Sequence, residues 1–228
     1  MENQQTNLLS IKGKILSAPT YSHSLLGEGF FTTQIEVKRL SDQVDVLPLT
    51  ISERLISGLQ AGQEIALLGQ LRSYNKLQDG HSKLMLSIFA RELIDPESAQ
   101  TNSITIVGYL CKEPIYRTTP FGREIADMLV AVNRAYNKSD YLPCIAWGRN
   151  ARFVKDLSVG QKLQLTGRVQ SREYQKKTDE GTITKVAYEI SISAIDLQDD
   201  VKQFVNNDAD NIVDASSFKL NTSAVEIN

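Results

Sequence analysis

The sequence contains one pattern twice, about 95 positions apart, and this duplication limits the folds open to the chain more than any other feature. Residues 11–15 (IKGKI) align with residues 106–110 (IVGYL). The same offset of 95 aligns further identical residues: Pro19 with Pro114, Tyr21 with Tyr116, Val37 with Val132, Arg39 with Arg134, Asp45 with Asp140, Leu47 with Leu142, and Pro48 with Pro143. After a short insertion the offset becomes 98, which aligns Gly69 with Gly167. Two copies at this spacing indicate two related domains rather than a solenoid.

Each copy has the alternation of apolar and polar residues that is typical of half-buried β-strands. In the second copy the pattern predicts strands at residues 103–111, 124–133, 141–147, 162–174 and 182–197. A short helix is predicted at residues 150–157, because Ala151, Val154 and Leu157 share one helical face. Three strands, a helix and two more strands is the element order of the five-stranded OB barrel.

The sequence therefore predicts an all-β protein of two tandem OB folds, each with a short helix. We expect the N-terminal OB fold at residues 1–98 and the C-terminal OB fold at residues 99–198. Residues 199–228 are rich in Asn, Asp, Ser and Thr and lack the apolar density of a core, so a disordered acidic tail is expected there.

Charge is distributed unevenly along the chain, whose formal net charge is −2. Residues 102–198 hold 14 Lys and Arg against 10 Asp and Glu, a net charge of +4. Residues 1–101 carry a net charge of −2 and residues 199–228 a net charge of −4. A basic module thus lies between an almost neutral one and an acidic tail, which favours an anionic ligand for the second copy.

Several other classes of protein fit poorly. No paired carboxylates, nucleophile with a base, or phosphate-binding glycine loop stands out, so we expect neither an enzyme nor a cofactor site. Two histidines and two cysteines, Cys111 and Cys144, offer no zinc site, and free buried thiols are expected. No basic apolar leader opens the chain and no apolar run approaches the roughly 18 residues that span a bilayer, which predicts a cytoplasmic protein.

Aromatic and basic residues gather in the second copy. Four rings lie in or beside its predicted strands: Tyr136, Tyr141, Trp147 and Tyr174. The basic residues around them are Arg134, Lys138, Arg149, Arg168, Arg172, Lys176 and Lys177. Rings on a cationic β-surface suit a single-stranded nucleic acid, because bases stack on the rings while Lys and Arg neutralise phosphates.

The alternative is that these rings belong to the barrel core. In the predicted strand 141–147, the even positions Leu142, Cys144 and Ala146 are small and apolar, as an interior face requires. The odd positions then face outward, which favours exposure of Tyr141 and Trp147. For Arg149 and Lys176, simple solvation is an equally good interpretation.

Residues 102–197 resemble bacterial single-stranded DNA-binding proteins over a whole OB domain. The matching stretches are 102–108 (NSITIVG), Glu113-Pro114 with Arg117 and 120–122 (PFG), 129–136 (LVAVNRAY), 139–148 (SDYLPCIAWG), 151–154 (ARFV) and 167–174 (GRVQSREY). The resemblance implies that the rings at Tyr136, Tyr141, Trp147 and Tyr174 stack on DNA bases, with Arg117 among the DNA-binding residues. It also implies a site without metal or cofactor.

Two departures from the family pattern shape the expectation. Family members end in an acidic tail tipped by Pro-Phe, which docks replication and repair enzymes, whereas this chain ends SAVEIN. In the first copy the equivalents of the four rings are Ser41, Val46, Ser52 and Lys76. We therefore expect a first copy that has lost the stacking surface and serves packing, oligomerisation or partner binding.

The sequence thus predicts a protein that coats single-stranded DNA during replication, repair or recombination, associated with the nucleoid in the cytoplasm. Single-stranded RNA is the alternative ligand. By analogy with family members that present four OB folds together, a homodimer is expected, with replication or repair proteins as further partners. The rival hypothesis is a protein-interaction scaffold, such as a primosome or replication accessory factor, whose OB surfaces bind proteins more than nucleic acid.

Overall fold

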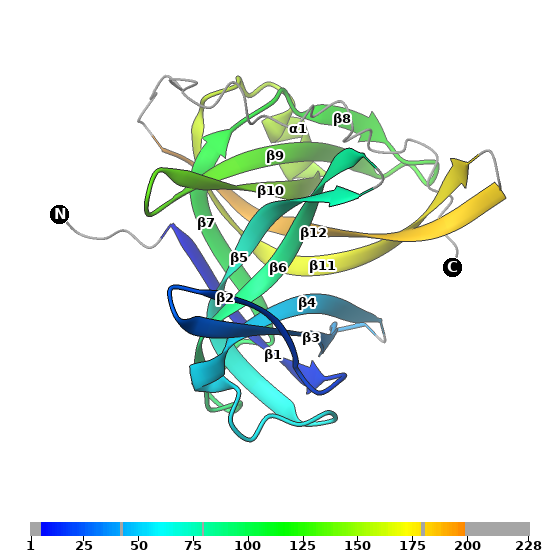
Figure 1. Cartoon of the computed structure of the whole chain (residues 1–228). Helices are drawn as coiled ribbons and strands as arrows, with labels where there is room; N and C mark the ends of the chain where they lie inside the picture. The colour runs from blue at the N-terminus through cyan, green and yellow to red at the C-terminus, as the bar shows by residue number, and fades with distance from the viewer. Residues whose placement is uncertain (1–5, 42, 79, 179–180, 199–228) are drawn as a thin grey trace.

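The first half of the chain forms a closed five-stranded barrel. The computed structural model describes residues 6–41, 43–78, 80–178 and 181–198 (Figure 1). The strands of the first barrel are β1 (Asn7–Ile15), β3 (Glu28–Lys38), β4 (Val44–Ser52), β5 (Glu64–Gln78) and β6 (His81–Ile94). Strand β1 pairs with both β3 and β5, β3 pairs with β4, and the parallel pair β4–β6 completes the ring. A sixth strand, β2 (Thr20–Leu25), forms a hairpin with β3.

The second half repeats this topology. Its barrel strands are β7 (Asn102–Leu110), β9 (Glu124–Arg134), β10 (Lys138–Trp147), β11 (Lys162–Thr178) and β12 (Gly181–Gln198). Strand β7 pairs with β9 and β11, and the parallel pair β10–β12 closes the barrel. Strand β8 (Ile115–Thr118), which the sequence pattern did not predict, forms a hairpin with β9. The expectation of an all-β protein with two tandem OB folds is confirmed.

The expectation of a helix in each barrel is wrong for the first barrel. Helix α1 (Arg149–Val154) lies between β10 and β11 in the second barrel, three residues shorter at its C-terminal end than predicted. At the equivalent place the first barrel has one 3-10 turn, η1 (Glu53–Leu55). Gly58 follows with a φ of 80°, a left-handed conformation that ends a helix, and the second copy has no glycine at the matching position.

Aligned glycines let each first strand bend from one neighbour to the next. A β-carbon at Gly13 would lie 2.2 Å from the carbonyl oxygen of Glu36, and one at Gly108 would lie 2.4 Å from that of Ala131. Both contacts are with the backbone of a neighbouring strand, β3 or β9, so a side chain would force the strands apart. This packing explains why the repeated motif carries a glycine at its centre.

The two barrels join through their first strands. Strand β1 pairs antiparallel with β7, so the twelve described strands form one continuous sheet. At the centre of this pairing Leu9 lies opposite Ile104, which is its own equivalent at the repeat offset of 95. A pseudo-twofold axis therefore passes between these two residues.

The same symmetry appears in the hydrogen bonds around the axis. Asn7 donates through Nδ2 to the carbonyl of Leu71 at 2.7 Å and accepts its N–H at 3.1 Å. Asn102 makes the same pair of bonds with Val169, at 2.7 and 3.0 Å. Each long hairpin also crosses toward the other barrel: β5 contacts β10, and β11 contacts β4 (Figure 1). The expected tail, residues 199–228, lies outside the described residues.

Candidate nucleic-acid interface

The predicted alternation of β10 holds at the core. Leu142, Cys144 and Ala146 are buried in the barrel interior, whereas Tyr141 is exposed and Trp147 is half-buried. Between the two rings, Pro143 and Ile145 share the outward face but are also buried. The interpretation of Trp147 and Tyr141 as core residues is therefore wrong.

A groove of about 1120 Å³ is lined mainly by residues of the second barrel, together with a few from the first. Trp147 of β10, Tyr174 of β11 and Tyr188 of β12 contribute rings to its lining, and Phe121 adds another from the β8–β9 loop. Five arginines and one glutamate also line it: Arg39, Arg117, Arg123, Arg168, Arg172 and Glu173. The groove thus combines rings with an excess of positive side chains.

Buried carboxylates hold most of these arginines in place. Arg117 Nε lies 3.0 Å from Asp127 Oδ2, and Arg172 Nε lies 3.2 Å from Glu189 Oε1. Gln170 also donates to Glu189 Oε1, at 2.8 Å. In each pair the carboxylate is buried and the guanidinium is partly exposed, so the acid fixes the arginine while its cationic end stays open to a ligand.

Burial shapes the protonation of these pairs. It raises the pKa of the Asp127 carboxyl above its ordinary value, against the opposing effect of Arg117. Burial disfavours the charged form of Arg172 as well, but the coulombic and hydrogen-bond interactions with Glu189 outweigh it and raise the pKa of this guanidinium. Burial, followed by the proximity of Arg39, lowers the pKa of Arg168.

Trp147 occupies the end of β10, where the chain turns into α1. Its indole Nε1 donates to Ser191 Oγ of β12 at 3.2 Å, which fixes the ring against the barrel wall. The next residue, Gly148, has a φ of 52°, a left-handed conformation that turns the chain sharply into the helix. The ring is therefore half-buried in a defined orientation at the groove, as a stacking platform requires.

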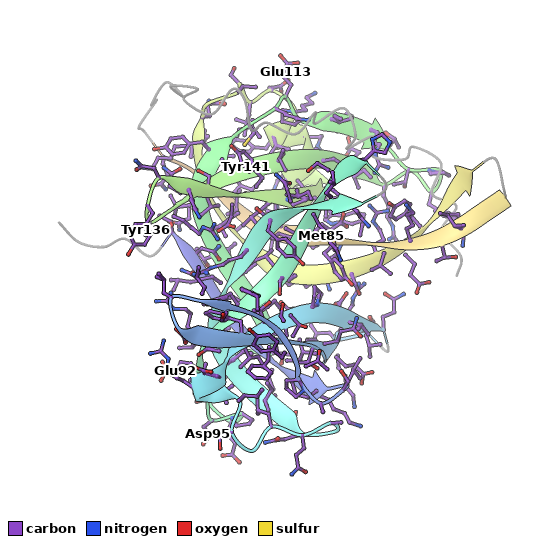
Figure 2. The ribbon with its side chains drawn as sticks, viewed as in Figure 1. Met85, Glu92, Asp95, Glu113, Tyr136 and Tyr141 are labelled. Carbon is purple, nitrogen blue, oxygen red and sulfur yellow. The ribbon has the colours of Figure 1, made fainter. Side chains whose placement is uncertain are left out.

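The other predicted residues form a second cluster at the opposite end of β10. Tyr136 lies in the β9–β10 turn with a φ of 62° and is 93% exposed, and Tyr141 lies on β10 (Figure 2). Arg134 Nη1 lies 3.4 Å from Asp140 Oδ1, and Lys138 is exposed. Tyr141 and Trp147 are six positions apart on an extended strand, a distance of about 20 Å. The structure thus divides the predicted site into two clusters rather than bringing it together.

Of the two remaining predicted basic residues, one lies in neither cluster and the side chain of the other is not described. Arg149 begins α1, where it is exposed and does not line the groove. Lys176 lies in β11, and its side chain is outside the described part of the structure.

Sequence reasoning missed four aromatic or basic residues of the groove, each for an identifiable reason. Tyr188 lies in a long alternating run that suited the barrel interior, while Phe121 and Arg123 lie in a loop without periodicity. Arg39 belongs to the first copy, which was expected to play no part in the site. The Pro-Phe-Gly stretch at residues 120–122 was the one available signal for Phe121.

The first barrel lacks the four rings predicted to stack in the second barrel, but it carries rings at other positions. His23 stacks on Phe30 with 5.2 Å between ring centroids, and Phe30 lies 5.7 Å from Phe89. The guanidinium of Arg72 lies 3.7 Å above the ring of Phe89. These rings contact one another and Phe30 is only 7% exposed, so this face is filled by its own side chains.

Neither cysteine lines the groove. Cys111 and Cys144 are free, and burial raises the pKa of the Cys111 thiol to about 12. Among the described residues, no three His, Cys, Asp or Glu side chains gather as a metal site would require. Nor does the described part of the chain contain a helix with the length and apolar character needed to cross a membrane.

Comparison with known proteins finds a family match in the second half of the chain. Residues 101–198 match the Single-strand binding protein family. These residues span the second barrel, from the start of β7 to the end of β12. Over 83 residues the chain is 37% identical to Single-stranded DNA-binding protein 1 of Staphylococcus aureus (strain COL), covering 33% of this chain and 50% of that protein. It is 34% identical over 83 residues to Single-stranded DNA-binding protein A of Bacillus subtilis (strain 168), covering 33% of this chain and 48% of that protein.

The chain thus spans about half the length of these curated relatives. One solved structure resembles the chain across both barrels: the wild-type single-stranded DNA binding protein from Thermus aquaticus. It superimposes with a TM-score of 0.67 at 18% identity, covering 86% of this chain and 95% of that one. At this identity the likeness shows a shared fold, that of two OB barrels in one chain.

Proposed function

We propose that this protein binds single-stranded DNA without catalysing a reaction, and that it holds the strand in the groove of the second barrel. The observation that carries the proposal is the set of arginines fixed by buried carboxylates around the half-buried ring of Trp147. Stacking on a ring contributes about 1–3 kcal/mol per base and tolerates any sequence. The arginines neutralise phosphates without reading bases. The groove therefore suits a strand of any sequence.

The second cluster extends the proposed path along β10. Tyr136 and Tyr141 offer exposed rings beside Arg134 and Lys138, at the end of the strand remote from the groove. A strand that followed β10 from Trp147 would meet these rings next. The process served would be replication, repair or recombination in the nucleoid, and a homodimer of the chain would present four OB barrels.

Titration of intrinsic fluorescence with oligo(dT) tests the proposal directly. Trp147 is the single tryptophan of the sequence, so the emission reports on the groove alone. We expect quenching that saturates with oligonucleotide, because a base stacked on indole couples to it. Unchanged emission while filter binding shows a complex would remove Trp147 from the site, and a lack of any complex would refute the function. Oligo(rU) as a competitor tests whether RNA is the preferred ligand.

A protein-interaction scaffold is the second candidate, and exposed leucines of the first barrel favour it. Leu26 is almost fully exposed in the β2–β3 turn, and Leu40 is fully exposed just beyond β3. Exposed apolar side chains of this kind are common at protein contacts. The same titration separates the two functions, because a scaffold would leave oligo(dT) unbound at physiological salt.

A further inference from the structure

The groove has a second wall, and that wall belongs to the first barrel. Gln34 and Arg39 from the β3 side and Gln43, Val44 and Val46 from the β4 side line it, opposite the run of β11 that carries Arg168 and Tyr174. The sequence predicted that residues 1–98 would serve packing, oligomerisation or partner binding. The groove instead lies between the two barrels.

Hydrogen bonds across the junction fix this wall against β11. Asp45 Oδ1 accepts the backbone N–H of Ser171 at 2.7 Å, and the N–H of Val46 donates to Ser171 Oγ at 3.2 Å. Arg39 donates through Nη2 to Asp45 Oδ1 at 2.7 Å and to the carbonyl of Ser171 at 3.1 Å. Bonds from both backbone and side chains hold the first barrel at this edge, so the wall is present before any ligand arrives.

The wall also adds positive charge to the groove. Asp45 is 0% exposed and lies within 4 Å of two guanidinium groups, that of Arg39 from its own barrel and that of Arg168 from the other. Both arginines are partly exposed, whereas the carboxylate between them is buried. Of the described residues that the first barrel contributes to the lining, none is acidic. An anionic strand would therefore meet two cationic groups placed side by side by one hidden acid.

The equivalent position on the other side of the pseudo-twofold axis has a different arrangement of arginines around its buried acid. Asp140, the equivalent of Asp45, lies 3.4 Å from Arg134, and its Oδ2 is buried without a hydrogen-bond partner. The position equivalent to Arg168 holds Gln70. Arg72 also acts electrostatically on Asp140, but its guanidinium lies over the ring of Phe89. Among the described residues, Asp45 therefore has two arginines within 4 Å, whereas Asp140 has one.

We propose that the first barrel is part of the single-strand site, with the phosphate backbone lying across Arg39 and Arg168 and against Gln34, Gln43 and Val44. This inference rests on the proposed function and extends it, because the bound strand then contacts both barrels. Asp45 acts as a positioning residue that holds the two arginines. The N-terminal OB fold contributes to binding through its edge at β3 and β4, not through its own ring-filled face.

Charge substitutions at Val44 test the inference in the full chain. Val44 is 45% exposed and makes no core contact, so Val44→Glu and Val44→Lys should both fold. One added charge beside a phosphate changes Kd about three- to tenfold at low salt. We expect Val44→Glu to weaken oligo(dT) binding by that factor and Val44→Lys to tighten it. Both effects should shrink as salt rises, whereas mere structural damage would weaken binding in both variants.

Two parallel variants separate the possible failures. Leu68→Glu adds the same charge to the outer surface of the first barrel, at a residue that is 40% exposed and does not line the groove, and should leave Kd unchanged. Trp147→Ala tests the proposed function itself. If Trp147→Ala weakens binding while both Val44 variants bind like the wild type, the strand is confined to the second barrel and the inference is wrong. If the wild type does not bind oligo(dT), the proposed function fails and the inference fails with it.

Discussion

Asp45 of the first barrel accepts a 2.7 Å hydrogen bond from the backbone N–H of Ser171 in the second barrel. The pseudo-twofold axis repeats this bond with Asp140 and Ser73, again at 2.7 Å. Each barrel therefore supplies one carboxylate that accepts a hydrogen bond from the backbone of the other barrel. These two bonds add to the pairing of β1 with β7. The two OB folds are thus joined by strand pairing and by this reciprocal pair of hydrogen bonds, one of which lies beside the groove.

Removing the carboxylate of Asp45 should destabilise the chain more than any other change at this junction. Asp45→Ala would leave Arg39 and Arg168 without their nearest counter-charge and the N–H of Ser171 without its acceptor. We expect the free energy of unfolding to fall by about 2–4 kcal/mol. Urea denaturation followed by circular dichroism measures this as a lower midpoint with an unchanged slope.

Asp140→Ala is the matched control at the equivalent position. Asp140 has one oxygen without a hydrogen-bond partner and a longer contact with its arginine, so less is lost when it is removed. A loss of about 1–2 kcal/mol is expected. Equal losses for the two variants would show that the second arginine on Asp45 contributes nothing.

The stability of the wild type should depend on pH through Asp140. Burial raises the pKa of this carboxyl above its ordinary value of 3.8, so the folded state favours the protonated form. A group with a raised pKa stabilises the fold at low pH, and this contribution is lost as pH rises through the folded pKa. Relative to Asp140→Asn, the wild type should therefore gain stability as pH falls from 7 toward 4. Urea midpoints at several pH values measure the difference, and a constant difference would contradict the assignment.

The sequence predicted the barrels because their signal is local and repeated. Alternation placed Leu142 and Cys144 inside and Trp147 outside, and the offset of 95 identified Asp45 and Asp140 as equivalents. The contact of Asp45 with Ser171 could not be predicted in this way, because an alignment of two copies shows which residues correspond and not which ones meet. The wall of the groove depends on that contact.

The composition of the site illustrates the same limit. Tyr136 and Trp147 were predicted together as members of one motif, but the length of β10 separates them. The absence of rings at Ser52 and Lys76 suggested a bare face on the first barrel. Phe30 and Phe89 fill that face from other strands, and positional equivalence cannot reveal such a replacement.

Trp147→Ala should weaken oligo(dT) binding by about 1–3 kcal/mol, since it removes one stacking platform. Its stability should change little, because the ring is half-buried outside the barrel core. Phe153→Ala is the control, as Phe153 is an exposed ring on α1 that does not line the groove. Fluorescence anisotropy with labelled oligo(dT) and thermal melting should be measured together. A stability loss of about 3–5 kcal/mol for Trp147→Ala would mark the ring as core.

Arg123→Ala should change the salt dependence of binding without changing stability. Arg123 is exposed at the groove. It takes no part in the ion pairs that the other groove arginines make with Asp45, Asp127 and Glu189. Loss of one phosphate contact should make the log–log slope of affinity against salt shallower by about 0.7. Arg117→Ala should shift the slope by the same amount but also lower the melting temperature, because it leaves Asp127 buried and unpaired. Slopes that match the wild type in both variants would show that these arginines do not contact the strand.

The two faces of the chain should respond differently to the loss of a tyrosine. Tyr174 lines the groove, whereas Tyr21 is an exposed ring of the first barrel that packs edge-on against Phe31, 5.7 Å between centroids. Tyr174→Ala should therefore weaken oligo(dT) binding by about 1–3 kcal/mol, and Tyr21→Ala should leave it within about twofold of the wild type. His23, Phe30 and Phe89 contact one another, so these rings present little free surface on which a base could stack. Anisotropy titrations of the two full-length variants at one salt concentration measure the difference. Equal losses would mean that the first barrel also stacks bases, and its contribution would then extend beyond the groove wall to the face that carries Phe30 and Phe89.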